Sequence, residues 1–169
     1  ATQLKRASFP LMSASDRQHT LAKSASITGT SLHTGEQVTL TLQPAPENFG
    51  FKFRRIDLED KPFISALVEK VQKVERATTI AEGGVNVHTV EHVISALTGM
   101  GVDNAIIEMD ANEPPIVDGS SQPFVELIKK AGVVAQEAAA RRGAAAARRD
   151  RLHAPRQSRG RHGCGCGYR

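Results

Sequence analysis

The sequence has few aromatic residues and almost no cysteine. Aromatic residues make up 4% of the 169 positions, and tryptophan is absent. The only cysteines are Cys164 and Cys166, so the body of the chain offers no thiols for the disulfide framework of a small secreted domain. No apolar run approaches the roughly 20 residues that a membrane helix needs. These absences favour a cytoplasmic protein.

The formal net charge of +4 is unevenly distributed along the chain. Residues 136–169 contain nine Arg, no Lys and two acids, which gives this segment a net charge of +7. The rest of the chain has 13 basic and 16 acidic residues and is therefore mildly acidic, at −3. The basic segment contains one aromatic residue, Tyr168, so it lacks the stacking platforms of single-stranded nucleic-acid binders. A non-catalytic domain whose tail binds nucleic acid or acidic partners is therefore the alternative to an enzyme.

Composition divides the chain into three parts. Residues 1–16 are predicted to be a flexible N-terminal extension, and residues 17–135 are predicted to form one folded domain. Residues 136–169 are made mostly of Ala, Arg and Gly. Such a segment buries too little apolar surface to offset its ordering entropy, so disorder is expected. The same composition also results when a GC-rich gene is read out of frame, and both explanations stay open.

The first half of the domain has the periodicity of strands. Residues 20–29 alternate loosely, and residues 37–45 alternate cleanly between apolar and polar positions. Residues 49–55 alternate through three phenylalanines, and residues 62–74 predict one or two short strands. Gly83 and Gly84 lie between two alternating arms and predict a hairpin.

Two helices are predicted in the second half. One covers residues 90–100, with Thr89 as its N-cap, and precedes a strand in "DNAIIEMD". The other covers residues 121–131, with Ser121 as its cap and an apolar stripe at Phe124, Leu127, Ile128 and Ala131. This order predicts an α+β fold, a two-layer domain in which both helices cover one face of a mostly antiparallel sheet.

Glu91 and His92 lie side by side in the first turn of the first helix, off its apolar stripe. The positive end of a helix dipole favours an ionised carboxylate and a neutral imidazole. A neutral imidazole can ligate zinc, and an ionised carboxylate can accept a proton from zinc-bound water. A surface acid beside a structural histidine would have the same sequence, so the pair alone leaves both interpretations open.

A longer set of motifs resembles a known enzyme family. The segment "TVEHVISALTGMGVDNAIIEMDANEPPIVDGSSQPFVELI", together with "SITGTSLHTGEQVTLTLQPAP" upstream, resembles the N-terminal half of UDP-3-O-acyl-N-acetylglucosamine deacetylase. The match runs from residue 18 to residue 136. "VHTVEH" and "EPPIVDGSSQPF" are most similar to forms fused to a 3-hydroxyacyl-carrier-protein dehydratase. This family of zinc amidases catalyses the committed step of lipid A synthesis.

The resemblance assigns a role to several residues. His92 corresponds to the zinc ligand that the first half supplies, and Glu91 corresponds to the general base. Leu32 and His33, in "SLHTG", correspond to residues that border the substrate site. Ala77 and Thr78, in "RATTI", fall in a segment that lines the site, where many members have cysteine at position 77. For Asp118 and Gly119 we expect a turn before the last helix and no contact with substrate.

The resemblance also implies a second half that this sequence does not match. The family takes its other zinc ligands from a second, similar domain, as a His and an Asp four residues apart. His153 and His162 are the only later histidines, and neither has an Asp four residues downstream. The sequence therefore predicts an incomplete Zn²⁺ site and a chain that is inactive alone, and another chain that supplies the missing half stays possible.

Overall fold

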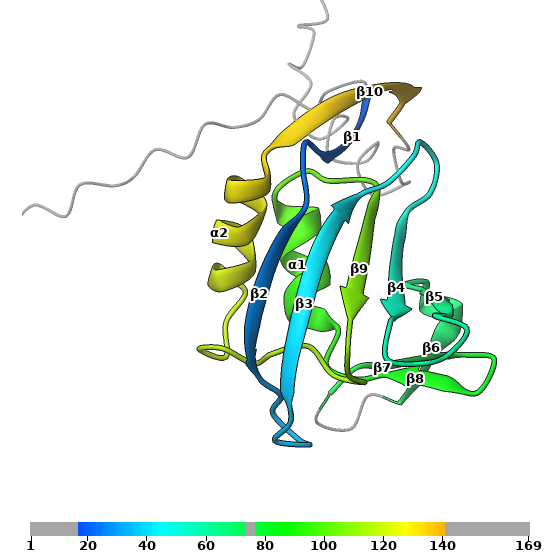
Figure 1. Cartoon of the computed structure of the whole chain (residues 1–169). Coiled ribbons are helices and arrows are strands. Elements are labelled where there is room, and N and C mark those ends of the chain that lie inside the picture. The colour runs from blue at the N-terminus through cyan, green and yellow to red at the C-terminus, as the bar shows by residue number, and fades with distance from the viewer. Residues whose placement is uncertain (1–16, 74–76, 141–169) are drawn as a thin grey trace, which may run out of the picture.

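A five-stranded mixed sheet forms the centre of the fold (Figure 1). The computed structural model describes residues 17–73 and 77–140, so the predictions for residues 1–16 and 141–169 lie outside the described part. The strand order is β2-β3-β9-β4-β5, in which β4 runs parallel to β9 and the other neighbours are antiparallel. The predicted α+β class and mostly antiparallel sheet are confirmed. The bounds of its strands are Ala25–Thr30 for β2, Gln37–Pro44 for β3, Phe51–Arg55 for β4, Phe63–Ser65 for β5 and Ala105–Met109 for β9.

The inward face of this sheet carries the apolar positions of its alternating strands. In β3, Val38, Leu40 and Leu42 are buried while the residues between them are partly exposed. β9 alternates in the same way, and its residues pair with those of β3 from Leu40↔Met109 to Pro44↔Ala105. Because successive side chains of a strand point to opposite faces, the clean alternation predicted for residues 37–45 selects the core face directly.

The two helices α1 (Glu91–Gly99) and α2 (Gln122–Ala131) contribute the other side of the core. The predicted stripe of α2 is buried at all four positions, and Gly132, with φ 76°, ends the helix as predicted. Figure 1 shows α1 behind the sheet and α2 beside it along the β2 edge. Among the described residues, neither helix has the length and apolar character needed to cross a membrane.

The predicted caps of both helices are wrong in their hydrogen bonds. Thr89 has φ 54°, and its hydroxyl donates to the buried carboxylate of Glu113 instead of accepting from a helix N–H. A carboxylate is the stronger acceptor, and the backbone geometry of Thr89 lies outside the extended region of an N-cap. Ser121 occupies the N-cap position of α2, but its hydroxyl bonds to that of Ser95.

A second, two-stranded sheet is formed by the two ends of the described chain. β1 (Arg17–Leu21) pairs antiparallel with β10 (Val133–Ala139). The strand predicted for residues 20–29 is therefore two strands in two sheets, and β10 continues four residues past the predicted domain end at 135. Gln136 belongs to the folded domain, because its side chain bonds to Asn104 and to the carbonyl of Ala45.

A small three-stranded sheet lies beside β5. It consists of β6 (Val71–Lys73), β7 (Thr79–Glu82) and β8 (Val85–Val87), and a short 3₁₀ helix, η1 (Val68–Lys70), leads into it. Gly83 and Gly84 join β7 to β8 with φ values of 59° and 81°, so the predicted hairpin is confirmed. Two consecutive positive φ values are the signature of a type I′ turn.

Candidate functional site

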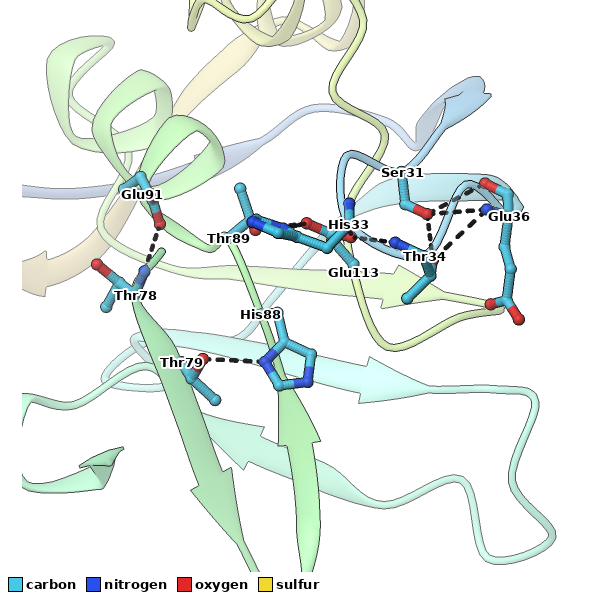
Figure 2. Close-up of polar contacts among 10 residues, drawn as sticks. All are labelled: Ser31, His33, Thr34, Glu36, Thr78, Thr79, His88, Thr89, Glu91 and Glu113. Atoms are coloured by element: carbon cyan, nitrogen blue, oxygen red, sulfur yellow. Dashed lines mark hydrogen bonds and ion pairs between the residues drawn. The ribbon is translucent and has the colours of Figure 1, made fainter. Parts of the chain in front are cut away.

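Three loops meet at one end of the large sheet and form the candidate site (Figure 2). The turn between β2 and β3 bridges to the loop after β9 at Ser31↔Pro115. The N–H of His88, before α1, donates to the carbonyl of Asn112 in the same loop at 2.9 Å. Segments that are distant in sequence therefore place the predicted site residues near one another.

Glu91 and Thr78, both predicted site residues, contact each other. The backbone N–H of Thr78 donates to Oε2 of Glu91 at 3.2 Å, which turns the carboxylate from the first turn of α1 toward the start of β7 (Figure 2). No hydrogen bond to the other carboxylate oxygen occurs within the described residues. One oxygen of Glu91 is thus anchored, and the other is left to interact with a ligand or with water.

His92 follows Glu91 on α1 and is half-buried. Asp118 lies in the loop before α2. Its carboxylate accepts hydrogen bonds from the N–H and the hydroxyl of Ser120 at 2.9 and 2.8 Å. The Ser120 N–H is the main cause that lowers the pKa of Asp118, and proximity to His92 contributes to the same shift. The bonds to Ser120 hold the turn predicted around Asp118.

The described residues do not by themselves make a metal centre. Nowhere in residues 17–73 and 77–140 do three His, Cys, Asp or Glu side chains come together as a possible metal site. Cys164, Cys166, His153 and His162 lie outside this part of the chain. A metal held by the imidazole of His92 with three protein ligands would therefore need ligands from outside the described residues.

His33 is held by a carboxylate that the sequence did not single out. Nδ1 of His33 lies 2.7 Å from Oε1 of Glu113, and its backbone N–H donates to Oε2 at 2.9 Å. The side chain of Glu113 is fully buried, whereas that of His33 is 45% exposed. The adjacent Leu32 is also exposed and makes no polar side-chain contact. The order of residues along the chain gives no signal for the His33–Glu113 pair, because 80 positions separate the two.

Glu113 is ionised in this setting. Burial is the largest single influence on its pKa and acts to raise it. The hydrogen bonds from Thr89 and His33 together outweigh burial, so the pKa of Glu113 lies below its usual value. The charge of this buried carboxylate is therefore compensated by the hydrogen-bond donors of Thr89 and His33.

An open pocket of about 510 Å³ lies next to His33. Its walls combine predicted and unpredicted residues: His33, Thr34, Gln72, Ala77, Thr79, Asn86, His88 and Asn112. His88 Nδ1 lies 2.9 Å from the hydroxyl of Thr79, and Oδ1 of Asn112 is buried without a hydrogen-bond partner. A second imidazole directly before the "TVEH" motif was a signal that could have identified His88. The pocket can offer hydrogen bonds to a polar ligand.

The predicted site residues fall into two groups. Glu91, His92 and Thr78 lie around the start of α1, and His33 and Ala77 line the pocket. Residues 77–79 connect the groups, because Thr78 contacts Glu91 while Ala77 and Thr79 face the pocket. Leu32 belongs to neither group.

Comparison with known proteins identifies relatives over most of the chain. The family model for LpxC, UDP-3-O-acyl N-acetylglycosamine deacetylase, matches residues 18–153. A UDP-3-O-acyl-N-acetylglucosamine deacetylase of Myxococcus xanthus is 52% identical over 121 residues, which cover 72% of this chain and 38% of the relative. That of Saccharophagus degradans is 50% identical over 123 residues, 73% of this chain and 41% of the relative.

Fused enzymes are among the relatives as well. The bifunctional enzyme LpxC/FabZ of Chlorobaculum tepidum is 49% identical over 120 residues, which cover 71% of this chain and 26% of the relative. The chain thus spans between about a quarter and two fifths of the length of these curated relatives.

Proposed function

The chain belongs to the UDP-3-O-acyl N-acetylglycosamine deacetylase family, and on that premise we propose that it supplies one half of an active site that hydrolyses the N-acetyl group of UDP-3-O-acyl-N-acetylglucosamine. The observation that carries the proposal is the pair Glu91–His92 in the first turn of α1, next to a polar pocket. The reaction adds water to the acetamide and releases acetate and a free amine. It would serve lipid A biosynthesis.

Glu91 acts as the general base in this proposal. Its oxygen Oε2 is anchored by the N–H of Thr78, so the carboxylate has a fixed direction and a second oxygen that can accept a proton from the attacking water. The helix N-terminus stabilises the ionised form that a base requires. The proton that Glu91 gains from water can later pass to the leaving nitrogen.

His92 would hold zinc together with ligands that the described residues do not provide. Zinc, when bound, polarises the amide carbonyl and lowers the pKa of water. A catalytic zinc usually has three protein ligands, whereas no three His, Cys, Asp or Glu side chains come together within the described residues. We therefore propose that residues 17–140 bind zinc weakly and have no measurable deacetylase activity until the remaining half of the site is supplied.

The substrate would lie over the pocket and the exposed turn beside it. His33 and Ala77 line the pocket, Thr78 lies between Ala77 and Thr79 with its N–H on Glu91, and Leu32 adds an exposed apolar surface. Neutral donors and acceptors such as the amides of Gln72 and Asn86 suit the hydroxyls of a sugar. We assign the pocket to the amino-sugar part of the substrate.

Acetate release by a chimaeric enzyme tests the proposal. Residues 17–140 would replace the matching N-terminal segment of the Myxococcus xanthus deacetylase, which is 52% identical to this chain. We expect zinc-dependent acetate release from the chimaera and none above blank from the 169-residue chain alone. A folded chimaera without activity would contradict the assignment of this half, and a normal rate from the chain alone would contradict the incomplete site.

A further inference from the structure

Glu113 joins the two groups of site residues through one buried carboxylate. Its oxygens accept four hydrogen bonds, two of them on each oxygen. Oε1 accepts from the hydroxyl of Thr89 at 2.6 Å and lies 2.7 Å from Nδ1 of His33. Oε2 accepts from the backbone N–H groups of His33 and Thr34 at 2.9 and 3.4 Å. The turn after β2 and the entry to α1 are therefore fixed to the same group.

The chemistry of this carboxylate determines which nitrogen of His33 carries the proton. An ionised carboxylate has acceptor sites only, so the nitrogen that faces it must be a donor. A neutral imidazole has one N–H, and the hydrogen bond made by one ring nitrogen sets the state of the other. With Nδ1–H bound to Glu113, Nε2 carries the lone pair. No hydrogen bond to Nε2 of His33 occurs within the described residues, and the ring lines the open pocket.

We propose that Glu113 is a positioning residue that fixes His33 in the Nδ1–H tautomer, so that Nε2 is presented to the pocket as a hydrogen-bond acceptor. Figure 2 shows the arrangement, with the His33 ring beside Glu113 and Thr89. The same carboxylate sets the place of this acceptor relative to α1, because Thr89 precedes Glu91 by two residues. Loss of Glu113 would therefore change both the direction and the chemistry of His33.

The tautomer restricts the ligand group that can bind at this point. A neutral ring with its lone pair on Nε2 accepts a hydrogen bond, so its partner is a hydroxyl or an amide N–H. A fully ionised phosphate has only acceptors and would meet lone pair against lone pair. The assignment of this partner to the amino sugar rests on the function proposed above, whereas the tautomer itself does not.

The ring nitrogens of the 169-residue chain can be observed directly by long-range ¹H–¹⁵N NMR of ¹⁵N-histidine-labelled protein. His33→Gln assigns the signal, and spectra are taken above the pH at which the ring loses its extra proton. We expect a protonated Nδ1 and a pyridine-type Nε2. A protonated Nε2 in the unmodified chain overturns the proposal. The sample contains no zinc and no substrate, so this result is independent of deacetylase activity.

Glu113→Gln tests whether the carboxylate causes the tautomer. A glutamine has one accepting oxygen, which must face the fixed N–H donors of His33 and Thr34. Its amide nitrogen then faces Nδ1 of His33, and we expect the ring to change to the Nε2–H form. The signal of His88, which bonds to Thr79, should not move and serves as the internal control. A folded Glu113→Gln protein with an unchanged His33 tautomer overturns the proposal.

Thr89→Val keeps the test available if Glu113→Gln does not fold. This substitution removes a donor from Oε1 and leaves the contact between Glu113 and His33 in place. We expect His33 to remain in the Nδ1–H form, because its own carboxylate partner is intact. A change to the Nε2–H form in this variant would show that Glu113 does not set the tautomer.

Discussion

Thr89→Val should destabilise the domain through a single hydrogen bond. The hydroxyl of Thr89 is buried and donates to the ionised Glu113 at 2.6 Å. A hydrogen bond to a charged group contributes about 1.5–3 kcal/mol. Valine is isosteric and β-branched, so the strain at φ 54° stays the same, and burial of the extra methyl offsets up to about 0.8 kcal/mol. The expected loss at neutral pH is roughly 1–2 kcal/mol.

The loss should depend on pH, because it arises from the charge of Glu113. The pKa of Glu113 is lowered in the folded state, so its ionised form adds stability above the unfolded pKa, about 4.3. That contribution disappears as the pH falls through the lower folded pKa. The difference between Thr89→Val and the unmodified protein should therefore shrink as the pH falls well below about 4.3.

Urea unfolding at neutral and acidic pH measures this difference. Thr39→Val is the matched control, because Thr39 shares a neutral, exposed hydroxyl pair with Thr28 on the open face of the sheet. The control should change stability by less than about 0.5 kcal/mol. A Thr89→Val loss as small as that of the control, or one of equal size at both pH values, would refute the role assigned to the charged hydrogen bond.

Three further predictions concern the metal, a turn and the core. Zinc should bind weakly to the 169-residue chain, and His92→Ala should abolish this binding in a calorimetric titration; unchanged binding would place the metal elsewhere. Gly84→Ala should lower the free energy of unfolding in urea by roughly 1–2 kcal/mol, because Gly84 has φ 81° in the β7–β8 turn. The space around Gly84 is open, so the cost comes from the backbone conformation and not from a clash. An unchanged free energy of unfolding would contradict the turn geometry. Phe124→Ala should cost about 3–5 kcal/mol, since the ring is 1% exposed between α2 and the sheet; Val125→Ala, at a partly buried position on the same helix, is the control and should cost less.

Local patterns made most elements predictable from the sequence. Val38, Leu40 and Leu42 alternate because one face of β3 is buried, and the stripe of α2 recurs because one side of that helix is buried. Gly83-Gly84 permits the two positive φ values of the turn. In each case a single segment carries its own signal, and tertiary contacts agree with it.

The features that could not be predicted from the sequence depend on residues that are far apart along the chain. β10 is mostly exposed and has little apolar periodicity, and it forms by pairing with β1 at the other end of the domain. Thr89 looks like a helix cap until Glu113 is known to lie beside it. Glu113 itself stands in a loop before two prolines, and its bond to His33 spans 80 positions. Local sequence does not encode such pairings.

The rate of acetate release by the chimaera with Glu91→Gln tests the central claim most directly. If Glu91 is the general base, kcat should fall by about 10²–10⁴-fold while KM changes little, because the substituted residue acts on the reacting water and not on substrate binding. Glu59→Gln, in the exposed turn after β4, should leave the rate unchanged. A Glu91→Gln chimaera that is as fast as the Glu59→Gln chimaera would contradict the proposed site.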